Sequence, residues 1–187
     1  MANWKGWLMV AHGRIPERLA VGSVKTPLGD VWVAASESGV RVMTVPDATV
    51  DECLAVARKQ DAEIVKCDER NAALELALNE VREYFAGKLQ VFTVPLDLRG
   101  TDFQRRVWSA VAAVPYGTTT TYLSIANQIG SPTAFRAVGA ANGANPAAII
   151  VPCHRIIGSS GGLHGYGGGL HQKRALLDLE AAHIDLC

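Results

Sequence analysis

The chain of 187 residues balances 18 Lys and Arg against 18 Asp and Glu, and 49% of its residues are hydrophobic. This composition is that of a globular protein with a hydrophobic core. Its four cysteines form no C-x-x-C pair and no segment approaches the length of a membrane span, which excludes a disulfide framework, a zinc ribbon and an integral membrane protein.

The sparse cysteines and the lack of a secretory pattern at the amino terminus favour a reducing, cytoplasmic compartment. We therefore expect no membrane partner. His12, Cys53 and Cys67 are too scattered along the chain to predict a metal site, and we expect none. Both Cys53 and Cys67 are interpreted as structural residues.

The charge is uneven along the chain. Residues 1–98 carry 11 Lys and Arg against 14 Asp and Glu, whereas residues 99–187 carry 7 against 4. The mildly basic second part permits nucleic-acid binding without requiring it, and an excess of this size is also common on an ordinary solvated surface. Together with the change in pattern near residue 98, it predicts two domains, 1–98 and 99–187.

The first half begins with strands. Residues 21–45 alternate between apolar and polar types and are interrupted by turn residues at 26–30 and 36–39. This pattern predicts a three-stranded meander.

Two helices and a further strand are expected after the meander. Residues 50–58 and 71–86 have helical spacing of apolar residues, and Gly87 ends the second helix. Residues 91–98 are interpreted as a strand, with Pro95 at its edge or end. The first half is therefore predicted to be a small α+β unit.

The second half is expected to be mainly helical. Thr101 or Asp102 can cap a helix over 103–114. Residues 118–122 look extended, and two short helices follow over 122–129 and 133–142, separated by a Gly-Ser-Pro turn. Two short helices around such a turn indicate a helix-turn-helix, although many helical hairpins bind nothing.

Arg136 is a lone charge at the start of the second of these helices, among alanines and glycine. Two interpretations remain open from the pattern. The arginine packs near the core against a buried partner, or it reaches outward to a ligand.

The tetrapeptide Pro152-Cys153-His154-Arg155 is the strongest sign of chemistry in the chain. It follows the apolar run 147–151, which we interpret as a short buried strand, and it precedes the glycine-rich stretch 158–169. Cationic neighbours are expected to lower the pKa of the Cys153 thiol and make it a nucleophile. The alternative is that Cys153 is a small hydrophobic residue beneath a loop.

Five ordered segments carry a family resemblance. They are RAVG (136–139), NGANP (142–146), IIVPCHR (149–155), GYGGG (165–169) and LLDLE (176–180). Together they resemble the O6-alkylguanine-DNA alkyltransferases over roughly residues 96–182, and upstream only TPLG (26–29) fits. The resemblance implies an α+β fold with a small amino-terminal ribonuclease H-like α/β domain and a mainly helical carboxy-terminal domain that holds the helix-turn-helix.

The resemblance implies that Cys153 takes the alkyl group from O6 of a damaged guanine. In the family, the adjacent histidine, a bridging water and a glutamate activate the thiol. The resemblance assigns the histidine to His154 and the glutamate to Glu180. Spacing alone would instead make Glu180 a solvated helix residue and His154 a core histidine. Asn145 is expected to hold the turn before the cysteine, and Tyr122 to aid departure of the base.

The resemblance also implies a double-stranded DNA partner that contains O6-alkylguanine, with O4-alkylthymine as a further candidate substrate. The damaged nucleotide would be flipped out of the duplex, with Arg136 filling its place. Contacts with the DNA backbone are expected from Gln104, Ser131 and Ser159. Residues expected around the base are Val151, Ser160, Tyr166 and Gly167, the last standing where many relatives carry serine or alanine.

The implied reaction forms a thioether, so each molecule would act once, without a cofactor and as a monomer. Three alternatives remain. A cysteine hydrolase would leave NGANP and RAVG unexplained. A lesion-binding relative without activity would lack Cys153. A regulator with an added zinc domain would need a four-cysteine cluster that this chain does not have.

Overall fold

The computed structural model describes residues 17–59, 62–64 and 71–184. Cys67 lies outside the described residues. The elements of the first half are β1 (Glu17–Thr26), β2 (Gly29–Ser36), β3 (Gly39–Met43), α1 (Val50–Arg58), β4 (Ala62–Ile64) and α2 (Ala72–Phe85). The second half contains α3 (Asp102–Ala112), β5 (Thr120–Thr121), α4 (Tyr122–Gln128), α5 (Phe135–Gly143), the 3-10 helix η1 (Cys153–Arg155), β6 (Ile156–Ile157) and α6 (Gly169–Ala181).

The predicted meander is confirmed, with a fourth strand added. The sheet order is β3-β2-β1-β4, and β1 pairs antiparallel with β2 but parallel with β4. The β1–β2 turn is closed by Thr26, whose hydroxyl donates to the Gly29 carbonyl and accepts from the Leu28 N–H. β4 was not predicted.

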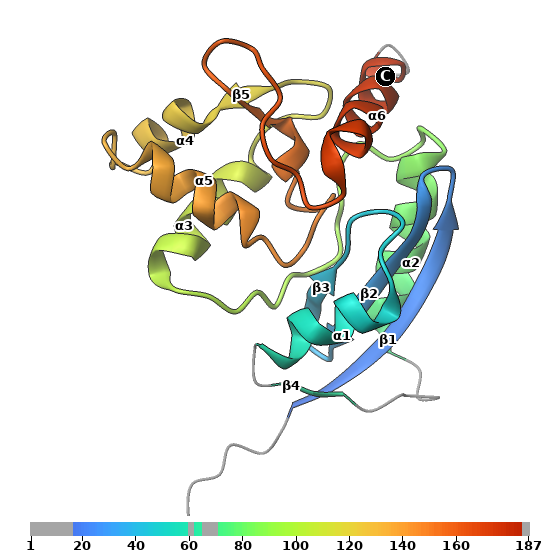
Figure 1. Cartoon of the computed structure of the whole chain (residues 1–187). Coiled ribbons are helices and arrows are strands. Elements are labelled where there is room, and N and C mark those ends of the chain that lie inside the picture. Colours follow the sequence, from blue (N-terminus) through green and yellow to red (C-terminus); the bar gives the residue numbers. More distant parts are fainter. Residues whose placement is uncertain (1–16, 60–61, 65–70, 185–187) are drawn as a thin grey trace, which may run out of the picture.

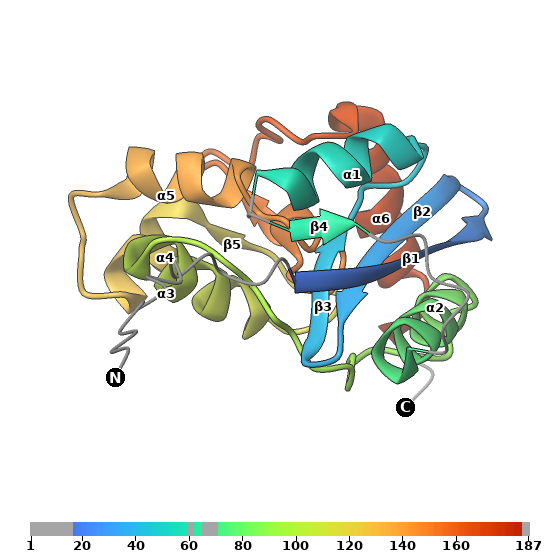
Figure 2. The same cartoon turned by 90° about the horizontal axis from the view of Figure 1, so that it is seen from below.

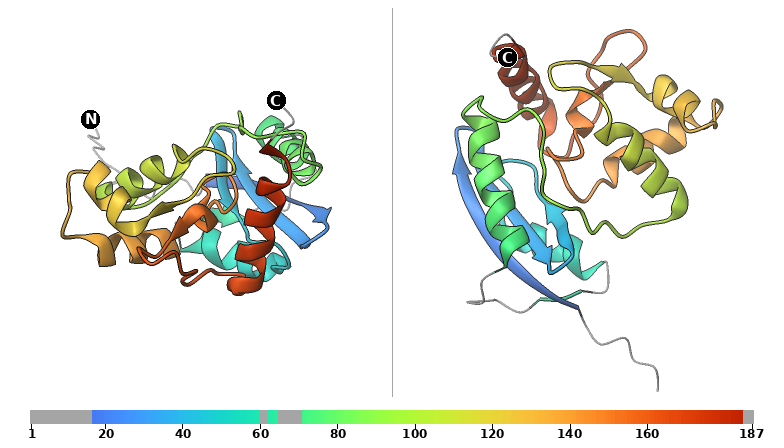
Figure 3. Two further views of the ribbon diagram at one scale, coloured as in Figure 1. Left: turned by 90° about the horizontal axis from the view of Figure 1, so that it is seen from above. Right: turned by 180° about the vertical axis from the view of Figure 1, so that it is seen from behind.

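The two helices of the first half cover opposite faces of this sheet (Figures 1 and 3). Side chains alternate along β2, so Val33 faces the main core with Val81 of α2, whereas Ala34 packs in a second cluster with Cys53 of α1. Both predicted helices are confirmed to within one residue at each end. Their bounds follow from caps, since the side chains of Thr49 and Asn71 accept from backbone N–H groups in the first turns.

The second half is helical, as predicted. α3, α4 and α5 pack against one another, and α6 lies between this group and α2 (Figures 1 and 2). Thr101 caps α3 in a capping box with Gln104. α5 begins at Phe135, two residues later than expected, because residues 131–134 form a turn in which the Ala134 N–H donates to the Ser131 carbonyl.

Residues 91–98 form no regular strand, contrary to our prediction. Only one isolated bridge joins this segment to the sheet, between Val40 and Leu96. The buried carboxylate of Glu80 accepts from the N–H groups of Thr93 and Val94, which removes the donors that a strand would use. Hydrogen bonds to the Glu80 side chain therefore fix the segment, instead of the backbone hydrogen bonds of a β-ladder.

The predicted strand over 147–151 is also wrong. Ala147 makes a single bridge to Met43, after which the chain turns so tightly that the Val151 N–H donates to the Ala147 carbonyl. Ile149 has a φ of 71°, in the left-handed region that β-branched residues avoid. The run is apolar because it is buried, and a short buried run does not reveal its backbone geometry.

One hydrophobic core joins the two halves. Val33 of β2, Val81 of α2, Val107 of α3 and Leu176 of α6 belong to the same buried cluster. The fold is therefore mixed α+β, with a small sheet in the amino-terminal part and helices in the carboxy-terminal part. Among the described residues, no helix is long and apolar enough to cross a membrane.

Gly39 is where the sheet meets the 91–98 segment, and the site requires glycine. Its φ is 146°, and a Cβ there would lie 2.3 Å from the Pro95 carbonyl oxygen. We expect Gly39→Ala to lower the free energy of unfolding by about 2–4 kcal/mol, measured by urea denaturation. The control is Gly143→Ala, at a helical position with open space around it, and we expect it to be neutral or slightly stabilising. Equal stability of Gly39→Ala and wild type would contradict this account.

Candidate active site

Cys153 lies at the wall of a cavity of about 350 Å³ that is partly open to the surface, in the size range of small-molecule pockets. It begins the 3-10 helix η1, and only 8% of its surface is exposed. Both halves of the chain line the cavity, with Val45, Tyr122, Gly139, Asn142, Gly143, Asn145, Ala148, Gly165, Tyr166 and Gly167 beside the cysteine. Five of the predicted site residues (Cys153, Tyr122, Asn145, Tyr166 and Gly167) are thus brought together.

Two asparagines hold the backbone around the cysteine. The Asn145 side chain spans the preceding turn, donating to the Val151 carbonyl at 2.8 Å and accepting from the Ala147 N–H at 3.1 Å. Asn142 of α5 donates to the carbonyl of Cys153 at 3.4 Å. The strained turn and the sulfur are therefore fixed relative to α5.

Glu180 of α6 is fully buried and saturated with hydrogen-bond donors. Its Oε1 lies 2.8 Å from Nε2 of His154 and accepts from the Tyr84 hydroxyl at 2.8 Å. Its Oε2 accepts from the Gly117 N–H at 3.0 Å. Arg155 donates to both oxygens through Nε and Nη2, at 2.8 to 3.1 Å.

These partners keep the carboxylate ionised. Burial alone would raise the pKa of Glu180, but the hydrogen bonds from His154 and Arg155 and the positive charge of Arg155 outweigh burial and lower it to about 2. The charge is compensated inside the protein, as a buried charge must be.

The contact with Glu180 determines the tautomer of His154. An ionised carboxylate only accepts hydrogen bonds, so Nε2 of the ring carries the proton. Burial lowers the pKa of His154, although Glu180 opposes this effect, and the ring is neutral near pH 7. Nδ1 is then a lone-pair acceptor, and it is buried with no hydrogen-bond partner in the described protein. His154 is thus oriented as a base.

The expectation that Cys153 has a lowered pKa is wrong for the resting protein. Burial raises the pKa of its thiol, and the opposing effects of Asn145, Lys173 and backbone N–H groups are smaller. Cys153 is buried at the cavity wall, so the charged form of its sulfur is poorly solvated. Cys153 is therefore a protonated thiol that needs a base when it reacts.

Sequence reasoning missed three groups of this network. Lys173 is completely buried, and its Nζ donates to the carbonyls of Ile156 and His164 at 2.7 and 2.8 Å. It lies seven residues before Glu180, on the same face of α6, a spacing that was visible in the sequence. The contacts of Arg155 and Tyr84 with Glu180 join distant segments and left no local signal.

The remaining predicted residues lie outside the cavity. Arg136 is exposed on α5, with its guanidinium 5.6 Å from the ring centroid of exposed Phe135. Gln104 is occupied in the cap of α3. Ser131 is half-buried, Ser159 and Ser160 are exposed, and Val151 lines a different cavity beside Trp108.

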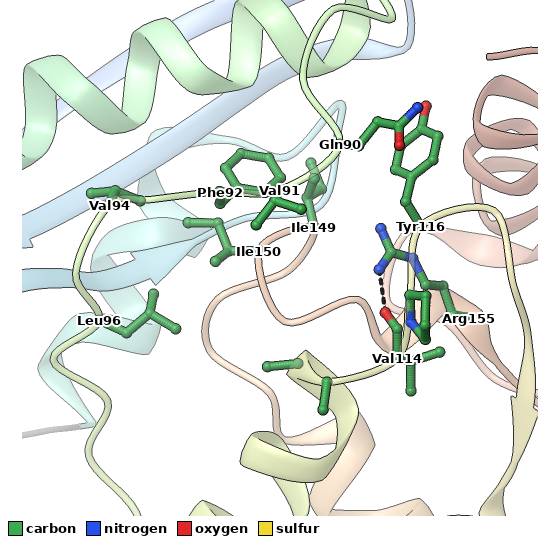
Figure 4. A pocket seen from close by; sticks show the side chains of 13 residues that line it. Gln90, Val91, Phe92, Val94, Leu96, Val114, Tyr116, Ile149, Ile150 and Arg155 are labelled. Atoms are coloured by element: carbon green, nitrogen blue, oxygen red, sulfur yellow. Dashed lines mark hydrogen bonds between the residues drawn. The ribbon is translucent and has the colours of Figure 1, made fainter. Parts of the chain in front are cut away.

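A second cavity, of about 320 Å³, is lined in part by Arg155 (Figure 4). The 90–96 segment, the end of α3, Ile149 and Ile150 surround it. Arg155 donates there to the Val114 carbonyl at 2.6 Å while its other nitrogens bind Glu180. The cysteine does not line this cavity, which marks the back of the network rather than its reactive side.

Comparison with known proteins matches most of the chain to one family. Residues 19–98 match the model described as "6-O-methylguanine DNA methyltransferase, ribonuclease-like domain". Residues 102–182 match the model described as "6-O-methylguanine DNA methyltransferase, DNA binding domain".

Individual relatives agree with these models. A methylated-DNA–protein-cysteine methyltransferase of Mycobacterium tuberculosis is 64% identical over 104 residues, which is 56% of this chain and 63% of the relative. The inducible enzyme of that name from Bacillus subtilis is 44% identical over 80% of this chain and 83% of the relative. A crystal structure of Mycobacterium tuberculosis OGT in complex with DNA superposes with a TM-score of 0.74 at 44% identity, covering 88% of this chain and 94% of that one.

The buried charge of Glu180 makes stability depend on pH. Its pKa is lower in the folded chain than in the unfolded one, so its contribution is complete above about pH 4.5 and is lost as pH falls toward 2. We expect Glu180→Gln to lower the free energy of unfolding by about 3–5 kcal/mol at pH 7, because Arg155 loses its buried counter-charge. The deficit should shrink below pH 4.5 in denaturant titrations.

The matched control for this substitution is Glu83→Gln, an exposed position on α2. It should change stability by less than about 0.5 kcal/mol at either pH. A deficit of Glu180→Gln that is constant from pH 7 to acid would show that Glu180 is not held ionised.

Proposed function

Because the chain belongs to the 6-O-methylguanine DNA methyltransferase family, we propose that it repairs DNA by moving an alkyl group from O6 of guanine to the sulfur of Cys153. The observation that carries this proposal is the buried pair of His154 and Glu180 beside a cysteine at the wall of a base-sized cavity. The relative crystallised with DNA supports duplex DNA as the partner.

The transfer is a displacement at carbon. The sulfur of Cys153 forms a bond to the alkyl carbon as the bond from that carbon to O6 breaks, and the electron pair stays on the guanine. The thiol proton passes through a bridging water to Nδ1 of His154, the one ring nitrogen that is not bound to Glu180. Glu180 then stabilises the imidazolium cation. The raised pKa of the thiol keeps it unreactive until the base is engaged.

Tyr122 is the proposed proton donor to the departing base. It is the first residue of α4 and lines the same cavity as Cys153. Burial and the nearby Cys153 raise the pKa of its phenol, so it carries its proton at neutral pH. As negative charge develops on guanine, a phenol within the cavity can donate to it.

Access requires that the damaged nucleotide leaves the duplex, since O6 lies inside the base stack. A base that pairs poorly is cheaper to extrude, by part of the few kcal/mol that flipping costs. α5 fits this step because Gly139 and Gly143 line the cavity while Arg136 is exposed on the same helix. Small residues let a helix approach DNA closely, and Arg136 can fill the emptied stack.

Other contacts proposed from the family are weaker in this structure. Gln104, Ser131 and Ser159 have exposed or half-buried side chains that can reach phosphate. Tyr166 and Gly167 line the cavity from the glycine-rich loop. Ser160 lies outside the cavity, and the backbone N–H and carbonyl of Val151 are already bonded within the protein, so their part in base recognition is the least supported.

The product is a thioether, which ordinary thiol exchange does not reverse. Each monomer would therefore react once, with no cofactor. O4-alkylthymine offers the same oxygen-bound alkyl carbon and is the second substrate that we propose.

The first test is the intact mass of the protein after incubation with a duplex that carries one O6-methylguanine. We expect one added methyl group per molecule, located on Cys153 by peptide mapping. Cys153→Ser should gain none. Cys53→Ser should react like wild type, because Cys53 is buried on the face of α1 that packs against the sheet, with its pKa raised to about 12. Turnover without an adduct would favour a cysteine hydrolase and contradict the proposal.

A second test separates extrusion from chemistry. We expect Arg136→Ala to slow transfer from duplex DNA by about 5- to 100-fold, because the stack is left unfilled. The reaction with the free base O6-methylguanine should keep its wild-type rate. Arg174→Ala, which removes an exposed charge from α6, is the control for net charge. Equal loss by Arg136→Ala on both substrates would show that Arg136 does not act in extrusion.

A further inference from the structure

Tyr84 lies in the half of the chain that carries neither the cysteine nor its base, yet its hydroxyl reaches Glu180. We infer that Tyr84 is a positioning residue for the reaction, which aims the Glu180 carboxylate at His154 and makes the amino-terminal half a working part of the site. This inference rests on the proposed function.

The contact is direct and completely enclosed. Tyr84 has no exposed surface, and its hydroxyl donates at 2.8 Å to Oε1 of Glu180. The same oxygen accepts from Nε2 of His154 at 2.8 Å and from Nη2 of Arg155 at 2.8 Å. Tyr84 and His154 therefore share one oxygen atom, and the position of that atom decides the position of the imidazole.

The hydroxyl is held in place by the amino-terminal half. Tyr84 sits in the last turn of α2, and its ring meets Phe85, Phe92 and Tyr116 at centroid distances of 5.2, 5.5 and 6.0 Å. Such aromatic contacts fix ring orientation. Burial and Glu180 raise the pKa of Tyr84 well above its ordinary value, so its hydroxyl carries its proton at neutral pH and can donate.

Among the described residues, the groups that face the Glu180 carboxylate come from three segments. Tyr84 approaches from α2, Tyr116 and the Gly117 N–H from the segment after α3, and His154 and Arg155 from η1. His154 in turn is affected by Glu180, Arg155 and Lys173. The Tyr84 hydroxyl is a neutral donor to the carboxylate, so its removal changes hydrogen bonding without changing net charge.

The loss of this hydroxyl has a directional effect. With one donor fewer, Oε1 keeps more of its negative charge and attracts the proton of His154 more strongly. The imidazole then stays protonated to higher pH and cannot accept the thiol proton there. The acidic limb of the reaction rate is expected to move to higher pH, which a purely structural role would not produce.

The test compares Tyr84→Phe with Tyr116→Phe. Tyr116 is the matched control because its hydroxyl is buried with no hydrogen-bond partner among the described residues, whereas its ring belongs to the same cluster. The readout is alkylation of Cys153 by iodoacetamide, located by peptide mapping, across the pH range in which histidine titrates. The sulfur displaces iodide and its proton goes to His154, so the assay needs no DNA.

We expect Tyr84→Phe to react about tenfold more slowly near neutral pH, the equivalent of one hydrogen bond to a charged group, with its acidic limb shifted upward. Tyr116→Phe should keep the wild-type rate and profile. Should Tyr84→Phe fail to fold, fluorotyrosine at position 84 replaces it; this keeps the hydroxyl as a stronger donor and should shift the limb downward. Identical profiles for wild type and the position-84 variant would overturn the inference.

The same proteins are then reacted with the O6-methylguanine duplex. One outcome is that iodoacetamide alkylates Cys153 with the expected difference between wild type and Tyr84→Phe, but the duplex transfers no methyl group to wild type. The positioning role then stands and the proposed function fails. If the duplex alkylates wild type and Tyr84→Phe equally at every pH, the function stands and the positioning role is overturned.

Discussion

The carboxylate of Glu180 is buried without any contact with solvent, and its charge must be balanced within the protein. Four residues from three segments meet this requirement by donating to it: Tyr84 of α2, Gly117 of the loop after α3, and His154 and Arg155 of η1. The second cavity ends at the same arginine (Figure 4). The packing of α6 against the rest of the chain and the orientation of the proposed base therefore depend on one charge.

The environment of the thiol is the counterpart of this network. Burial favours the neutral forms of both Cys153 and His154, so the resting site holds a protonated thiol beside a neutral imidazole. In a protein that would react only once, an unreactive resting thiol protects the acceptor from other electrophiles. The same burial limits the solvation of a thiolate once it has formed, which makes the sulfur strongly nucleophilic.

The two halves differ in their surfaces and share their interior. The helical half carries the exposed arginine and the small residues of α5, which suit a DNA partner, while the sheet half supplies Val45 to the cavity wall and Tyr84 to the carboxylate. The common core from β2 to α6 makes these contacts rigid. The amino-terminal half is thus more than a scaffold beside the reactive half.

Local patterns in the sequence determined the meander, the caps of α1, α2 and α3, and the neighbourhood of Cys153 and His154, because these depend on residues close together in the chain. Only the tertiary structure decided the turn at 147–151, the irregular segment at 91–98, the raised pKa of Cys153 and the approach of Tyr84 to Glu180 across 96 residues. Burial and long-range hydrogen bonds determine all four of these features. Both depend on residues far apart in the chain, so a local sequence pattern does not reveal them.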